Sequence, residues 1–143
     1  MMTNPSPTSK SLDLRVILST ASLEFVWWLM AVLVVSIAGY PGVVCVTPMA
    51  WLLALRVGNI CVVRSRSEQS RQRILEASIA GAILGLLQGI LFLIVVPFMG
   101  PYPSDEITKT VVLTLTMILL GMVAGAGLSF FTAFLNEQRR QKS

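Results

Sequence analysis

Glu24 and Arg56 are charged side chains that fall well inside apolar stretches of the sequence. A charge in the hydrocarbon layer of a membrane costs about 2.5–3.5 kcal/mol on insertion scales, so such residues are usually paired or functional. Two kinds of chemistry are open to them: a structural ion pair, or transport in which Glu24 couples the movement of a proton or an ion. A neighbouring guanidinium favours the ionised carboxylate, which makes proton cycling harder. The remaining alternative is that each side chain reaches separately to the cytoplasmic interface.

Few side chains in the sequence could support metal, redox or catalytic chemistry. The chain has no histidine, so it lacks the usual haem ligand, the commonest zinc ligand and the commonest general base. Cys45 and Cys61 are sixteen residues apart, about 24 Å along a helix, which is too far for a disulfide. We expect two buried apolar thiols. No glycine-rich phosphate loop and no nucleophile with an adjacent base is found, so we predict a protein that is not an enzyme and has no cofactor and no metal site.

The elements that carry Glu24 and Arg56 are expected to be membrane helices. The chain is 55% hydrophobic and 13% charged, with a mean hydropathy of +0.77. Apolar runs long enough to span a bilayer lie at about 19–39, 43–63, 74–96 and 107–135. We therefore predict an all-α integral membrane protein with a four-helix transmembrane domain over 16–135. The flanking segments are predicted to be a flexible cytoplasmic tail (1–15) and a basic cytoplasmic tail (136–143).

The first apolar run has a second interpretation. Ser36-Ile37-Ala38 resembles the small-residue cleavage site of a signal peptide. Glu24 at the mouth of the apolar core is unusual for a signal peptide, so we favour a retained span.

Turn residues divide the four spans into two antiparallel hairpins. Gly39-Tyr40-Pro41-Gly42 closes the first, and Pro97 with Gly100-Pro101-Tyr102-Pro103 ends the third span. In an antiparallel hairpin, residues equally far from the turn lie at the same depth. Glu24 and Arg56 are level by this count, so we predict that they form an intramembrane ion pair.

Small residues four apart mark the packing face of the second hairpin. Four-residue spacing puts them on one stripe of a helix, as in a glycine zipper, where another helix can approach closely. The same count places the two stripes level: Ala77, Gly81, Gly85 and Gly89 opposite Ala133, Ser129, Gly125 and Gly121. We expect these stripes to pack against each other, with packing against another chain as the alternative.

Gln88 adjoins this stripe and is predicted to be a buried polar residue in need of a partner. Trp28 and Trp51 come to a similar depth, so we expect an indole N–H to donate to the Gln88 amide oxygen.

Charge sets the expected orientation. Ten of the eleven lysines and arginines lie toward one side of the predicted topology, and Lys109 alone lies on the other. The positive-inside rule then puts both termini in the cytoplasm. The net charge of +4 is explained in this way, so no nucleic-acid partner is predicted. The arginine loop serves as a topology signal or binds anionic lipid headgroups through Arg64, Arg66, Arg71 and Arg73.

Two functions fit these features. The first is a non-catalytic accessory, assembly or stabilising subunit, in a lipid bilayer such as the bacterial plasma membrane, that packs against other membrane helices or against itself. The second is a small homo-oligomeric transporter or channel that uses Glu24. In size and in its early intramembrane acid the chain resembles the small multidrug-resistance transporters. It departs from that pattern by placing Arg56 level with the acid, which opposes proton coupling.

Overall fold

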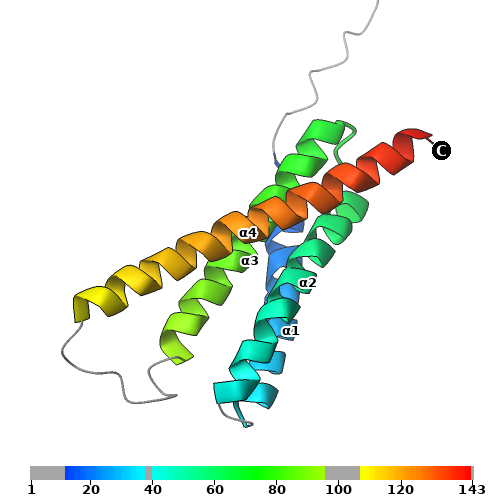
Figure 1. Cartoon of the computed structure of the whole chain (residues 1–143). Helices are drawn as coiled ribbons and strands as arrows, with labels where there is room; N and C mark the ends of the chain where they lie inside the picture. Colours follow the sequence, from blue (N-terminus) through cyan, green and yellow to red (C-terminus); the bar gives the residue numbers. More distant parts are fainter. Residues whose placement is uncertain (1–11, 38–39, 96–106, 143) are drawn as a thin grey trace, which may run out of the picture.

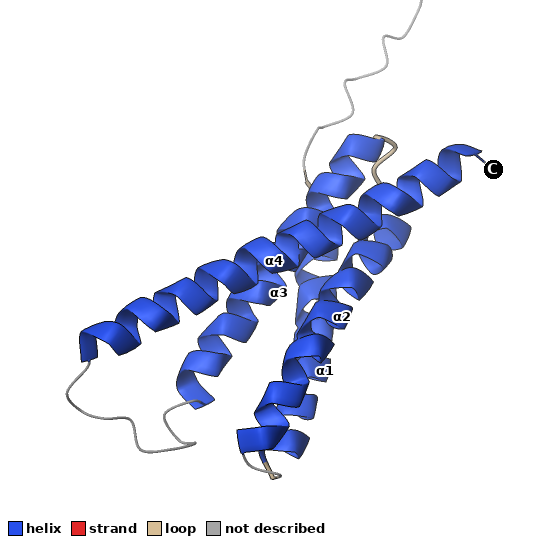
Figure 2. Cartoon of the chain, viewed as in Figure 1, coloured by secondary structure: helices blue, strands red, loops and turns tan. Residues whose placement is uncertain are grey.

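The chain folds into four helices in a computed structural model that describes residues 12–37, 40–95 and 107–142. They are α1 (Leu14–Ser36), α2 (Tyr40–Arg64), α3 (Ser70–Val95) and α4 (Ile107–Lys142). Figure 2 shows only helix and connecting loop in these residues. The prediction of an all-helical chain is confirmed.

Local capping explains where the helices begin at the end of the bundle that holds the α2–α3 loop. The Asp13 carboxylate accepts a hydrogen bond from the Val16 amide at 3.2 Å, which caps α1. In the loop, the Ser65 hydroxyl accepts from the Ser67 amide and the Ser67 hydroxyl accepts from the Gln69 amide. At the other end of the chain, α4 stays helical to Lys142, so it takes in most of the predicted basic tail. Of the first predicted turn, Tyr40, Pro41 and Gly42 already belong to α2, whereas Gly39 and the second predicted turn lie outside the described residues.

Three stretches are long and apolar enough to cross a membrane: Leu14–Val35, Ser70–Leu91 and Leu115–Lys142. They overlap three of the four predicted spans, and they support a membrane protein.

The helices form a bundle in which α2 and α3 are central (Figure 1). Helix α1 packs against both of them from one side, and α4 crosses both from the other side. Within the described part, α1 and α4 have no contact. The core therefore lies between the central pair and α1, with its fully buried side chains including Ile17, Val57, Cys61 and Leu84. Cys61 is a free thiol, and the side chain of Cys45 lies outside the described residues.

Candidate functional site

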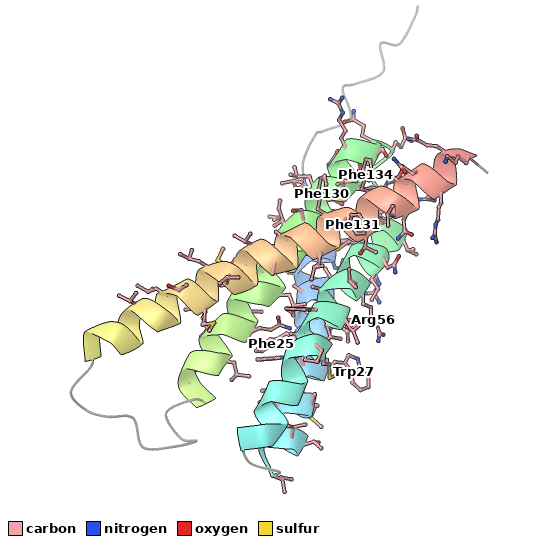
Figure 3. The ribbon with its side chains drawn as sticks, viewed as in Figure 1. Phe25, Trp27, Arg56, Phe130, Phe131 and Phe134 are labelled. Atoms are coloured by element: carbon pink, nitrogen blue, oxygen red, sulfur yellow. The ribbon has the colours of Figure 1, made fainter. Side chains whose placement is uncertain are left out.

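Glu24 and Arg56 meet between α1 and α2. Arg56 Nε lies 3.2 Å from Glu24 Oε1. The two side chains differ in exposure: Glu24 is fully buried, whereas the side chain of Arg56 is 58% exposed. Figure 3 shows Arg56 extending outward from α2. The pair thus reaches from the core to the surface. Pairing and outward extension were alternatives in the sequence, and Arg56 does both.

Further polar groups lie on the same inward face of α1 as Glu24. Thr20 and Trp28 are one turn before and one turn after it, and both are buried. Apart from the ion pair of Glu24 with Arg56 and the Cys61 thiol beside Thr20, the hydroxyl of Thr20, the carboxylate of Glu24 and Trp28 Nε1 have no hydrogen-bond partner among the described residues. Each of these groups is costly to bury without a partner.

Gln88 belongs with this group. Its Nε2 is buried and also lacks a hydrogen-bond partner in the described part of the chain. The expected bond from Trp28 to Gln88 is not formed, since Trp28 Nε1 has no acceptor. Trp51, the other proposed donor, is 58% exposed and lies on the outer surface.

The two small-residue stripes bring the backbones of α3 and α4 together. A Cβ added at Gly85 would overlap the carbonyl group of Gly121, and one added at Gly81 would overlap the carbonyl oxygen of Gly125. Only a residue without a Cβ fits at either position. Ala77 and Ala133, at the ends of the stripes, are fully buried.

The register of these stripes differs in part from the level pairing expected. A Cβ added at Gly81 would lie against Ser129, its expected partner, and equally against the carbonyl oxygen of Gly125. Gly85 meets Gly121 rather than Gly125, and Gly89 meets Ile118 rather than Gly121, each about one helical turn from the expected partner. Packed helices interdigitate, so a small residue lies between two residues of the facing helix rather than opposite one. Helix α4 also crosses α3 at an angle (Figure 1). Counting from the turn gives depth, and it does not give this offset.

Ser129 joins α4 to α2 as well, a contact that the sequence analysis missed. Its hydroxyl donates to the carbonyl oxygen of Ala54 at 2.6 Å, and a Cβ at Gly58 would overlap the Ser129 carbonyl oxygen. Ala54 and Gly58 are themselves small residues four apart. That spacing was the available indication of a packing stripe on α2.

Two buried glutamates link the helix ends beside the α2–α3 loop through hydrogen bonds and an ion pair. Glu76 of α3 accepts from the Asp13 amide at 3.0 Å and from the Ser65 hydroxyl at 2.6 Å. It therefore ties α3 to the start of α1 and the end of α2. Asn136 on α4 bonds to Asn59 on α2 in the same part of the bundle.

Glu137 of α4 makes the second attachment. Its carboxylate lies 2.9 Å from Arg73 Nε and accepts from the Ser70 hydroxyl at 2.9 Å. Arg73 is therefore only 17% exposed and is committed to the α3–α4 contact. Of the four arginines for which headgroup binding was the alternative to a topology signal, Arg64, Arg66 and Arg71 are exposed, and Arg73 points inward.

These sites contain the groups for structural pairing and for hydrogen bonding inside an apolar bundle. No group of three or more histidine, cysteine, aspartate or glutamate side chains in the described ranges could hold a metal ion. No family model, curated protein or solved structure matches the chain.

Proposed function

We propose that the chain is a small, non-catalytic multi-pass membrane protein that acts as an accessory, assembly or stabilising subunit by packing against other membrane helices. The observation that carries this proposal is the low burial of α4 inside the chain. In its apolar stretch 17% of the residues are buried inside the chain, against 33% in the stretches of α1 and α3. Of these three stretches, the one in α4 therefore leaves the largest share of its residues for lipid or for a partner helix.

The outward face of α4 has a shape suited to helix packing. Gly127 is exposed, and a Cβ added there would meet no atom within 4 Å. Val123, Phe130, Phe131 and Phe134 surround it and are exposed (Figure 3). Small residues allow close approach between membrane helices, and aromatic side chains beside such a notch supply contact area.

The proposed topology has all four helices crossing the bilayer as two antiparallel hairpins, with both termini in the cytoplasm, as in a bacterial plasma membrane. The α2–α3 loop and the end of α4 lie at the same end of the bundle (Figure 1). Arg64, Arg66, Arg71 and Arg139 are exposed at that end. A basic excess at one end supports a cytoplasmic assignment for it.

Gentle extraction tests the packing proposal. We expect native mass spectrometry of protein taken from native membranes in mild detergent to show a complex larger than one chain. Gly127→Leu should abolish the complex without unfolding the chain, because nothing inside the bundle touches this position. Ser22→Leu, which enlarges an exposed small residue of α1, is the matched control. A strictly monomeric wild-type protein would overturn the proposal.

A transporter or channel that uses Glu24 is the second candidate, and the fully buried carboxylate of Glu24 is the observation that favours it. Uptake or efflux in proteoliposomes should then be lost in Glu24→Gln and retained in Glu68→Gln, which changes an exposed loop residue. Equal rates in the wild type and Glu24→Gln would exclude this role.

A further inference from the structure

We propose that Thr20, Glu24, Trp28 and Gln88 line an internal site that binds water between α1 and the central helices. This inference goes beyond the packing function and does not depend on it. It rests on the position of the four side chains and on the hydrogen-bonding groups that each presents.

The four side chains lie at neighbouring depths in the bundle. Thr20, Glu24 and Trp28 are successive turns of the inward face of α1. The hydrogen bond from the Asp13 amide to Glu76 sets α1 and α3 level at one end, and the two helices run in the same direction (Figure 1). Gln88 is twelve residues beyond Glu76, and Phe25 is twelve residues beyond Asp13. Gln88 therefore lies at about the depth of Phe25 and of its neighbour Glu24.

The hydrogen-bonding groups require a ligand that both accepts and donates. Trp28 Nε1 and Gln88 Nε2 are donors, so they cannot satisfy each other. Glu24 offers two acceptor oxygens, of which only Oε1 lies beside Arg56, and Thr20 offers a hydroxyl whose one neighbour of this kind is the weak Cys61 thiol; within the described chain no strong hydrogen-bonding group satisfies the rest. Water can accept from the two nitrogens and donate to the carboxylate, and buried water typically makes about three such bonds.

A metal cation fits this site less well. Arg56 already supplies a positive charge 3.2 Å from Glu24 Oε1. Two of the four side chains present N–H groups, which repel a cation. The thiol of Cys61 lies beside Thr20, and it is too weak a hydrogen-bonding group to take the place of water.

Bound water has a consequence for Glu24. It solvates the carboxylate inside the bundle and leaves the guanidinium of Arg56 free to extend outward, as observed. The acid is then accommodated by hydration from within together with the arginine at the surface.

Indole N–H exchange tests the site in the full-length protein in lipid nanodiscs, with the tryptophans labelled with ¹⁵N. Trp28 is buried in protein, whereas Trp27 faces outward from the apolar stretch of α1 that is long enough to cross a membrane, and it serves as the internal control. We expect a water exchange peak for Trp28 and hydrogen exchange at least about tenfold faster than for Trp27. Exchange at Trp28 as slow as at Trp27 would overturn the proposal in the wild-type protein, without any variant.

Two variants locate the water. Thr20→Val keeps the shape of the side chain, and Gln88→Leu removes the amide. Each should slow Trp28 exchange by about tenfold or more. Thr132→Val, on α4 and away from α1, should leave it unchanged. Fast exchange that is unaffected by either variant would show that water reaches Trp28 by another route, and would also overturn the proposal.

Discussion

The carboxylate of Glu24 is enclosed by the bundle, and its cationic partner is more than half exposed. This asymmetry follows from the side chains, since arginine has a long apolar stem and glutamate does not. The attraction between them is weakened by the exposure of the guanidinium, yet the carboxylate has no other cation within ion-pair distance in the described residues. Replacing Arg56 should therefore lower the stability of the fold mainly because the buried carboxylate of Glu24 loses its cationic partner.

A double-mutant cycle measures this coupling. Arg56→Met should lower the free energy of unfolding by about 2 kcal/mol, because an unpaired buried charge is left behind. Once Glu24 has been replaced by Gln, Arg56→Met should cost less, because no charge remains to be stranded. Reversible unfolding in detergent micelles gives both values.

Arg66→Met serves as the control for this cycle, since Arg66 lies in the exposed loop and makes no ion pair with Glu24. Its effect should be within about 0.5 kcal/mol of zero. Additive effects of the Glu24 and Arg56 changes would show that the two side chains do not interact in the folded protein.

Depth counting in the sequence brought Glu24 and Arg56 to one level, and the 3.2 Å contact agrees with that count. The roles of Glu76 and Glu137 could not be found in this way. Both lie at the ends of apolar runs, where a carboxylate is usually solvated. Their partners, Ser65, Ser70 and the Asp13 amide, come from loops and helix ends, whose geometry no periodicity specifies.

Helix α4 carries glycines in two opposite situations. Gly121 and Gly125 lie against the backbone of α3, whereas Gly127 faces outward with no neighbour inside the chain. Spacing alone identifies the first two, since they belong to a stripe of small residues. Spacing also places Gly81, Gly85 and Gly89 on one face of α3. Which residues of α4 they meet depends on the angle at which the two helices cross.

Alanine substitution separates these situations. Gly85→Ala should lower stability by about 2–4 kcal/mol, because its Cβ would overlap the carbonyl group of Gly121 and force two backbones apart. Gly127→Ala should be neutral or stabilising by about 0.5–1 kcal/mol, since alanine has the higher helix propensity and fills open space. Thermal unfolding in one detergent compares the two directly. Equal losses would mean that α3 and α4 do not approach at Gly85.

In the part of the chain that the structure describes, several polar contacts between helices gather at one end of the molecule. The hydrogen bonds of Glu76, the Glu137–Arg73 ion pair and the Asn59–Asn136 bond all lie toward the α2–α3 loop. The apolar lengths of the helices were predictable, because hydropathy depends on composition alone. The contacts of α2 with α4 and of α1 with α3 were not predictable, since lipid and protein interiors are equally apolar and hydropathy does not distinguish the face toward each.

Sidedness is the property of the whole molecule that decides the proposed topology. If α2 crosses the bilayer along with the three stretches already long and apolar enough to do so, the α2–α3 loop and the end of α4 lie on one side and the end of α1 on the other. If α2 does not cross, the end of α1, the α2–α3 loop and the end of α4 all lie on the side of the membrane opposite the start of α1.

Single cysteines distinguish these arrangements. In a chain with Cys45 and Cys61 replaced by alanine, Ile37→Cys, Glu68→Cys and Gln141→Cys each place one thiol at an exposed position. With the protein in a bacterial plasma membrane, we expect an impermeant maleimide to label Ile37→Cys in intact spheroplasts, and Glu68→Cys and Gln141→Cys only in inverted vesicles, because the basic end faces the cytoplasm. Labelling of Ile37→Cys and Glu68→Cys from the same side would show that α2 does not cross, and the two-hairpin topology would be wrong.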